Sequence, residues 1–272
     1  MSATSKPHSI VVGVDLSPYS KTVVRQAKIL ATGMKVPVIY VLVYEDIQHF
    51  DDLKTETAKI SSKLREKARK SYGLGIGARI EIRFGRAEDE ILKVARSQKK
   101  PLIMVGHRSL GPVASFFLGS VADKLASLSP YPVWIHRGEK AVRPRRILVP
   151  TDFDRRTDRA LSLVENFRRD FKSHVEAHHI VGEPFPILDY PTWKRLEEKM
   201  AGEAERKMTA FGRRHPQLRV GLSRGGVAAG IRRQAQRSDL IAIAPRRKPK
   251  SSFGRVTGKL VRSGTKPVLV VP

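Results

Sequence analysis

The stretch SIVVGVDLSPYS, residues 9–20, contains the pattern that decides the fold. A short run of β-branched residues ends at Asp15, turn residues follow, and apolar residues then recur at helical spacing. The stretch RRILVPTDFDRRT, residues 145–157, repeats this order with Asp152 in the place of Asp15. Pro-led apolar runs close both halves, YPVWIH at residues 131–136 and KPVLVV at residues 266–271. The nearly constant offset between these landmarks predicts a tandem duplication of a unit of about 135 residues.

Apolar strand patterns alternate with helical patterns in each unit. The expected strands are 10–14, 38–43, 78–84, 102–105 and 133–136, then 147–149, 175–180, 218–221, 240–243 and 268–271; the expected helices are 20–34, 53–72, 88–97 and 120–128, then 156–167, 191–213, 228–237 and 256–262. Continuous apolar strands between helices are typical of a parallel sheet that is covered on both faces. The sequence therefore predicts an α/β protein with two domains, residues 1–140 and 141–272, and ligand space beyond the carboxyl ends of the strands.

Composition narrows the class of protein. Of the 272 residues, 40% are hydrophobic, which is enough to bury a core, and none is cysteine, which excludes disulfides and thiolate metal sites. No apolar run approaches the roughly 18 residues that a membrane helix needs. We therefore expect a cytoplasmic protein with no membrane association.

The formal net charge of +26 is the most unusual bulk property, and the second half of the chain carries the larger share of it. Such a charge attracts polyanions in a salt-dependent way, but it is equally compatible with a basic surface adapted to its solvent. Charge alone does not choose between these interpretations.

A glycine-flanked segment, VGHRSLGPVASFFLGS at residues 105–120, joins an expected strand to an expected helix. Gly106 follows the strand, and Gly119 and Ser120 precede the helix. Glycine lets backbone amides approach a phosphate closely, and a helix N-terminus favours an anion. The spacing by itself fits a loop that only turns the chain just as well.

The order of these features along the whole chain resembles that of the universal stress protein family. The nucleotide-binding members of that family carry the loop Gly-x2-Gly-x9-Gly-Ser/Thr. This sequence has Gly106-His107-Arg108-Ser109, nine further residues, and then Gly119-Ser120, so serine replaces the second glycine. The resemblance implies two tandem Rossmann-like domains of the adenine nucleotide alpha hydrolase-like kind, each with a five-stranded parallel sheet.

The resemblance also implies a binding site for ATP or AMP, with or without Mg²⁺, in the first domain. Asp15 would meet the adenine or ribose end of the nucleotide, and Val43 would hold the base through its backbone. The ribose and phosphates would be surrounded by Gly106, Ser109, Gly119 and Ser120. Two charged neighbours, His107 and Arg108, are either solvated loop residues or a compensation for Ser109 that adds positive charge near the phosphates.

The second domain departs from this pattern after its fourth strand, where the sequence reads APRRKPKSSFGRV at residues 244–256. Ala244 and Pro245 replace the opening glycine, and Arg255 follows Gly254 in the place of serine or threonine. Asp152 is retained. The cations of this segment, Arg246, Arg247, Lys248 and Lys250, can still attract an anion, but we expect no ordinary nucleotide site here.

Other groups of polar residues point to no catalytic or metal site. His178 and His179 are neighbours on an expected strand and face opposite sides, which argues against a metal site with His174. Asp152, Asp154 and Asp158 lack the spacing of a calcium loop, and Asp154 fits better as a helix cap. No Walker lysine motif, Gly-x-Ser-x-Gly or His-Glu-x-x-His occurs. The sequence therefore predicts a protein that is not an enzyme.

Two hypotheses follow. The first, which the resemblance implies, is a non-catalytic stress-response regulatory protein that binds adenine nucleotide in its first domain. Members of the family commonly pair through their last strands, so the resemblance also implies that residues 133–136 and 268–271 pair the two domains as an internal pseudo-dimer; a homodimer would be a further assembly. The alternative is a module for a polyanion, nucleic acid or acidic protein, that has lost the nucleotide. The aromatic fraction of 7% argues against base stacking on single strands. Under either hypothesis the charge predicts weak, salt-sensitive binding of nucleic acid.

Overall fold

The computed structural model describes residues 6–45, 53–107, 119–183, 189–245 and 255–272. The first half contains β1 (Ser9–Val14), α1 (Pro18–Met34), β2 (Val38–Tyr44), α2 (Leu53–Tyr72), β3 (Arg79–Phe84), α3 (Ala87–Arg96), β4 (Pro101–Gly106), α4 (Ser120–Leu128) and β5 (Val133–His136). The second half contains β6 (Arg146–Pro150), α5 (Arg155–Phe171), β7 (His174–Val181), α6 (Tyr190–Arg214), β8 (Arg219–Arg224), α7 (Val227–Ala235), β9 (Leu240–Ile243), α8 (Arg255–Ser263) and β10 (Val268–Val270). Each element that the sequence predicted is present in this order.

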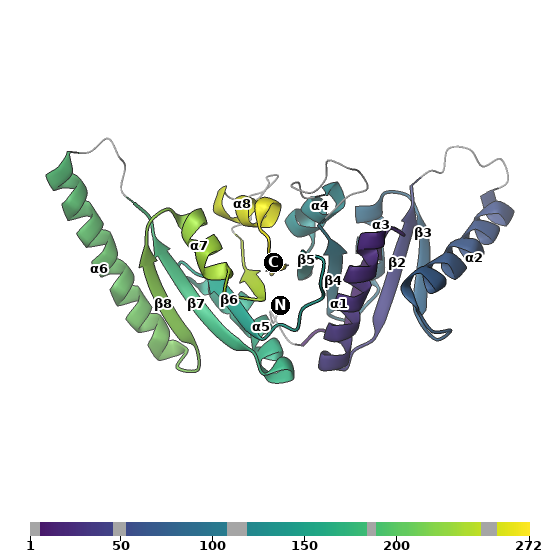
Figure 1. Cartoon of the computed structure of the whole chain (residues 1–272), viewed down its shortest axis with the longest axis horizontal. Helices are drawn as coiled ribbons and strands as arrows, with labels where there is room; N and C mark the ends of the chain where they lie inside the picture. The colour runs from purple at the N-terminus through teal and green to yellow at the C-terminus, as the bar shows by residue number, and fades with distance from the viewer. Residues whose placement is uncertain (1–5, 46–52, 108–118, 184–188, 246–254) are drawn as a thin grey trace.

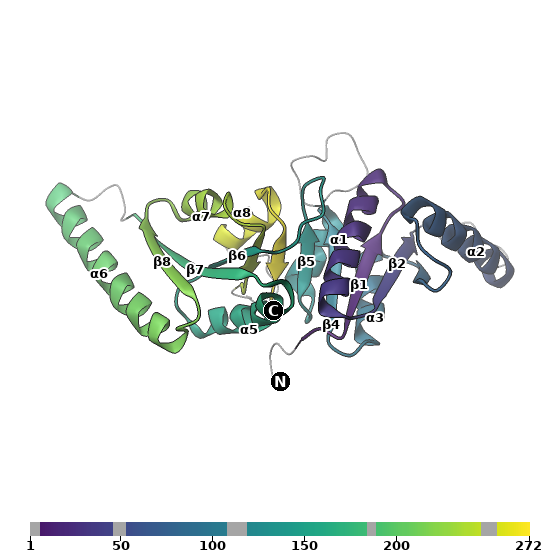
Figure 2. The same cartoon turned by 60° about the horizontal axis from the view of Figure 1, so that its bottom comes forward.

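The strands form one ten-stranded sheet in the order β3-β2-β1-β4-β5-β10-β9-β6-β7-β8, which runs the length of the molecule (Figure 2). Within each half all neighbouring strands are parallel, so each half is the five-stranded parallel sheet expected from the sequence. The halves meet where β5 pairs antiparallel with β10, through Val133 opposite Val270 and Ile135 opposite Val268. The expected pairing of the two terminal strands is therefore present, and it merges the two sheets into one. The division at residue 140 stays a prediction.

Helices cover both faces of this sheet (Figure 1). Ile91 of α3, Leu125 of α4, Ile231 of α7 and Val261 of α8 belong to one buried apolar cluster. The helices α1, α2, α5 and α6 contribute buried residues to a second cluster on the opposite face. The strands pack against both layers, which explains why their sequences are continuously apolar.

Backbone geometry repeats between the halves as closely as the sequence does. Leu16 and Phe153, each directly after the aspartate that follows the first strand, have φ angles of 61° and 60°. Lys35 and Lys172, each at the C-cap of the next helix, both have φ of 56°. A left-handed conformation is uncommon outside glycine, so its recurrence at matched positions supports the duplication.

The two halves also pack against each other away from the strands. The indole of Trp134 on β5 stacks on the ring of Phe167 on α5, with centroids 6.0 Å apart. Gly33 of α1 faces Phe171 so closely that a Cβ on Gly33 would lie 2.3 Å from Cε1 of that ring. The side chain of Gln26 exchanges two hydrogen bonds with the backbone of Val142, at 2.9 and 2.7 Å. These contacts bury α1 and α5 against one another beneath the β5–β10 pair.

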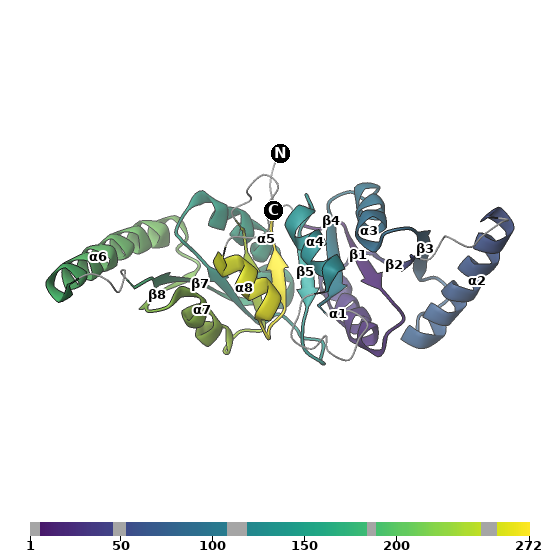
Figure 3. The same cartoon turned by 90° about the horizontal axis from the view of Figure 1, so that it is seen from above.

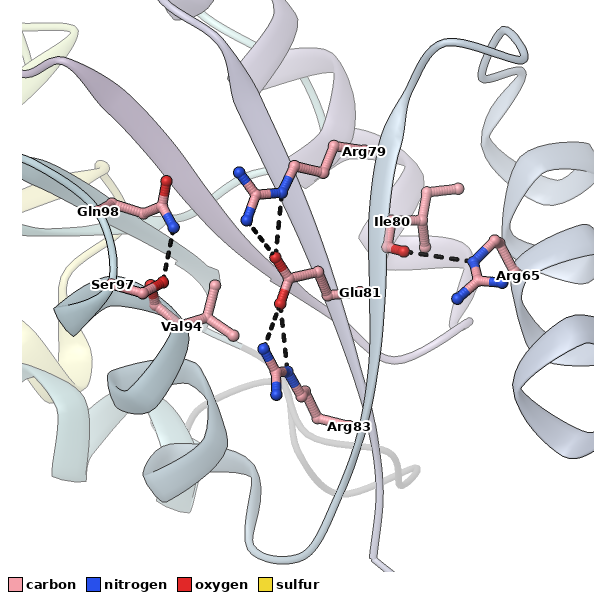
Figure 4. Close-up of polar contacts among 8 residues, drawn as sticks. All are labelled: Arg65, Arg79, Ile80, Glu81, Arg83, Val94, Ser97 and Gln98. Carbon is pink, nitrogen blue, oxygen red and sulfur yellow. Dashed lines mark hydrogen bonds and ion pairs between the residues drawn. The ribbon is translucent and has the colours of Figure 1, made fainter. Parts of the chain in front are cut away.

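The outer strand β3 is protected by charge. Glu81 accepts bonds from the guanidinium groups of Arg79 and Arg83, each with a shortest distance of 2.6 Å (Figure 4). Burial alone would raise the pKa of Glu81, but the bonds from Arg83 and Arg79 outweigh it and lower that pKa. Arg65 of α2 also donates to the carbonyl of Ile80, at 3.4 Å. Charged side chains along an outer strand discourage pairing with another chain.

No helix in the described ranges is long and apolar enough to cross a membrane.

Candidate functional site

A cavity of about 680 Å³ opens at the carboxyl ends of β1, β2 and β4 in the first half. The strand order reverses between β1 and β4, which is the place where doubly wound sheets bind ligands. The cavity is lined by Gly13, Val14, Asp15, Leu16, Ser17, Tyr19, Ser20, Val41, Leu42, Val43, Tyr44, Glu45, Leu64, Ala87, Ile91, Val105, Gly106, Gly119, Ser120, Val121 and Ala122. Apolar side chains therefore form much of the wall, and polar groups gather at the strand ends.

Asp15 is held by the start of α1. Its Oδ1 accepts a hydrogen bond from the hydroxyl of Ser20 at 2.6 Å and another from the amide of Ser17 at 3.1 Å. The left-handed turn at Leu16 makes this arrangement feasible, and the Leu16 amide donates to the hydroxyl of Tyr72 at 2.8 Å. Desolvation by burial raises the pKa of Tyr72 to about 12, so its hydroxyl stays protonated at neutral pH. The carboxylate of Asp15 is thus oriented while its residue remains exposed to the cavity.

The N-terminus of α4 forms another side of the cavity. Gly119 is its N-cap, and the Gly119 amide donates to the carbonyl of His107 at 2.9 Å. Helix geometry leaves the next amides, those of Ser120, Val121 and Ala122, without an intrahelical partner. All three residues line the cavity. This side therefore presents backbone donors that the helix itself does not pair and the positive end of a helix dipole, which together suit an anion.

Gly106 has a packing reason to be glycine. A Cβ at this position would lie 2.8 Å from Cε1 of Tyr19, on α1. The hydroxyl of Tyr19 in turn donates to the carbonyl of His136 at 3.0 Å and lies 2.9 Å from Nδ1 of His107. Gly106 thus admits the Tyr19 ring beside the cavity, and this explanation does not require a ligand.

The imidazole of His107 lies away from the cavity. His107 is 6% exposed, packs edge-on against the Tyr19 ring and is absent from the cavity lining. His107 is therefore not a solvated loop residue, and it is not among the described residues that line the cavity. Its place beside the buried His136 adds to desolvation in lowering the pKa of His136 to about 4.

The matching residues of the second half are arranged differently. The hydroxyl of Thr157, in the place of Ser20, lies 2.8 Å from the hydroxyl of Thr151 and so does not hold Asp152. The Asp152 side chain is 71% exposed, and its Oδ1 lies 3.8 Å from Nδ1 of His179. The His179 ring packs beside Phe153, with centroids 5.1 Å apart. Asp152 therefore matches Asp15 in sequence but lacks the serine contact that orients Asp15.

The structure brings together five of the six residues expected at the site, namely Asp15, Val43, Gly106, Gly119 and Ser120. Ser109 and Arg108 lie outside the described residues, as do the cations at 246, 247, 248 and 250. Sequence analysis missed Tyr19, Glu45 and Leu64, which also line the cavity. For Glu45 a signal existed, because it directly follows the second strand of a parallel sheet.

The prediction that Asp154 caps a helix is confirmed. Asp154 is the N-cap of α5 and accepts from the amides of Arg156 and Thr157, at 3.0 and 3.3 Å. The histidines of β7 have separate partners, because Nδ1 of His178 lies 2.9 Å from Glu176 whereas His179 contacts the Thr151 carbonyl at 2.6 Å. Within the ranges described, no group of three or more histidine or carboxylate side chains is placed to hold a metal ion.

Fold and cavity define the class: a duplicated, doubly wound α/β protein with a ligand-sized cavity at the switch point of its first sheet. The model of the universal stress protein family matches residues 7–137 and again residues 144–272. The chain therefore belongs to the universal stress protein family and carries two of its domains in tandem.

Known members resemble the chain along its whole length. A universal stress protein of Mycobacterium tuberculosis is 25% identical over 309 aligned residues, which cover 99% of this chain and 96% of that protein. One from Thermus aquaticus is 28% identical over 135 residues, 47% of this chain and 98% of its own length, so it corresponds to a single half. The crystal structure of a universal stress protein from Archaeoglobus fulgidus superposes with a TM-score of 0.69 at 18% identity, covering 98% of this chain and 99% of that one. This last likeness concerns the fold.

Proposed function

We propose that the first-half cavity binds an adenine nucleotide, ATP or AMP, and that the protein acts as a non-catalytic regulator in the stress response. The observation that carries the proposal is the assembly of Asp15, Val43, Gly119 and Ser120 around one cavity of about 680 Å³. These residues come from the ends of two strands, β1 and β2, and from the start of α4, and a volume of this size is usual for a small-molecule site.

The chemistry of the lining fits the parts of a nucleotide. Apolar side chains such as Val41, Leu42 and Ile91 offer a surface for a base. The carboxylate of Asp15 can accept hydrogen bonds from an exocyclic amine or a ribose hydroxyl. The amides at the start of α4 suit phosphate oxygens. Where Mg²⁺ accompanies ATP, phosphates and water usually supply most of its ligands, so no dedicated protein cage is required.

Titration calorimetry with ATP and with AMP tests the proposal. We expect one site per chain, and we expect Asp15→Ala and Gly119→Val each to weaken binding by roughly tenfold or more, since each removes or blocks a charge-assisted contact. The matched control is Asp152→Ala, which should leave affinity within about twofold because that side chain lies in the other half. Absence of binding by the unmodified protein, or two equivalent sites per chain, would contradict the proposal.

Binding of a polyanion is a second candidate, favoured by the charge of α7. This helix carries the exposed Arg232 and Arg233 and contains no acidic residue, in a chain of net charge +26. Contacts of this kind release counterions, so affinity for duplex DNA should fall by orders of magnitude between about 50 and 200 mM salt if six or more phosphates are neutralised. Tight, sequence-selective binding that persists at about 200 mM salt would place nucleic acid ahead of nucleotide as the natural ligand.

A further inference from the structure

We infer that Arg262, a residue of the second half, makes the first-half cavity favour a nucleotide with several phosphates over a monophosphate, by neutralising Asp123 at the start of α4. The inference rests on the proposed binding of adenine nucleotide. It gives the second half a role in ligand binding at this cavity, although no described residue of the second half lines the cavity.

Asp123 stands close to the expected position of the phosphates. It is the acidic residue of the first turn of α4, three positions after Ser120, which lines the cavity. Three residues of helix rise by about 4.5 Å, a separation along the helix axis that is shorter than the Debye length of about 8 Å at physiological salt. A carboxylate at a helix N-terminus is favoured by the same dipole that would favour a phosphate. An uncompensated Asp123 would therefore compete with a bound anion, and more strongly when that anion carries more charge.

Arg262 supplies the compensation from the other half of the molecule. Its Nε lies 3.2 Å from Oδ1 of Asp123, with the two side chains 48% and 32% exposed. The helices that carry them, α8 and α4, lie at the centre of the molecule on the same face of the sheet (Figures 1 and 3).

The end of α8 is held in place by the first half. Arg137, which directly follows β5 and is 5% exposed, donates to the carbonyls of Val261 and Gly264, the latter at 2.5 Å. These carbonyls flank Arg262 in the chain. Burial lowers the pKa of Arg137 to about 10, which still leaves it charged at neutral pH. Arg137 therefore fixes the last turn of α8 beside α4 and keeps Arg262 within reach of Asp123.

The ion pair between Arg262 and Asp123 has no symmetry-equivalent counterpart between the two halves. α4 and α8 are equivalent nine-residue helices, and their positions match at an offset of 135. By this offset Asp123 corresponds to Gly258 and Arg262 corresponds to Ser127. The reciprocal ion pair cannot form, so the contact is not an inevitable product of the symmetry of the fold. Its one direction agrees with a single nucleotide site in the first half.

The test compares ATP with AMP by titration calorimetry on the full chain. Arg262→Gln should weaken ATP binding by about three- to tenfold, a range set by the partial exposure of the pair, and should change AMP binding by less than about twofold. The matched control is Arg213→Gln, which removes the same charge from an exposed position on α6 and should alter neither affinity. Equal weakening of ATP and AMP by Arg262→Gln, or no weakening, would overturn the inference.

A second variant separates the electrostatic role from a merely structural contact between the halves. Asp123→Asn should restore ATP affinity when combined with Arg262→Gln, because the repulsion that Arg262 offsets is then gone. A structural contact would leave the double variant no better than the single one, and that result would also overturn the inference. Failure of the unmodified protein to bind either nucleotide is a different outcome, since it would remove the proposed function together with the inference.

Discussion

His136, the last residue of β5, is fully buried, and neither ring nitrogen has a hydrogen-bond partner in the described part of the chain. Desolvation, aided by His107, lowers its pKa from 6.5 to about 4, so the folded protein keeps this imidazole neutral. The unfolded chain takes up a proton near pH 6.5. Protonation of His136 in the unfolded chain therefore does not reduce the stability of the folded protein above about pH 6.5. It reduces that stability progressively as the pH falls from about 6.5 toward 4.

His136→Phe should consequently flatten the pH dependence of stability. Between pH 7 and pH 5 the unmodified protein should lose on the order of 2 kcal/mol of unfolding free energy through this residue, and the variant should lose correspondingly less. Urea unfolding at a series of pH values measures the difference. His174→Gln, at an exposed site on β7, serves as the control. Parallel pH profiles for the unmodified protein and His136→Phe would show that the buried imidazole is not the cause.

At this scale, sequence reasoning could place residues whose contacts are local. Asp15 is identified by the strand that precedes it and is held by Ser17 and Ser20, a few positions away. It failed for Tyr19 and His107, because the contacts that define them join positions 88 and 117 residues apart. No local pattern shows that a loop histidine turns inward to meet a tyrosine.

Among the elements, the close approach of α1 to α5 gives a sharp prediction for two glycines. Gly33→Ala should destabilise the protein by about 1–3 kcal/mol, because the new Cβ would overlap the ring of Phe171, at 2.3 Å. The control is Gly212→Ala on α6, where nothing lies within 4 Å of the new Cβ. There the helix propensity of alanine should stabilise the protein by about 0.5–1 kcal/mol. Thermal unfolding should show a lower midpoint temperature for Gly33→Ala and a higher one for Gly212→Ala. A stabilising effect of Gly33→Ala would contradict the packing described for α1 and α5.

The order and type of the elements could be predicted, since the inner strands are apolar on both faces, the outer strands β3 and β8 alternate apolar and polar residues, and the helices show apolar residues at helical spacing. Their ends were harder to place. The sequence predicted a helix over 156–167, but α5 extends to Phe171, which is 2% exposed and stacks on Phe167. Residues 168–170, Arg-Arg-Asp, interrupt the apolar pattern, so the sequence did not predict the last turn of α5. The burial of that turn depends on α1 of the other half.

For the whole molecule, the shared core predicts a single unfolding transition. Trp134 of the first half stacks on Phe167 of the second, and β5 pairs with β10, so neither half can unfold without exposing the other. The chain has two tryptophans, and Trp193→Phe would leave Trp134 as the only one. Its fluorescence and the far-ultraviolet circular dichroism of all helices should then give coincident urea curves. Two separated transitions would show that the halves unfold independently.

The antiparallel contact of β5 with β10 also has a genetic consequence. When a pairing of this kind joins two copies of a single gene product, every mutation appears on both sides of the contact and must be tolerated twice. Here both strands belong to one polypeptide, so a change on one side leaves the other intact. Thr157 could replace the serine that orients the first aspartate, and Arg262 could arise opposite Asp123, without any matching change in the sister copy. Because the two units are joined in one chain, matched positions can carry different residues, and each half can take on its own role.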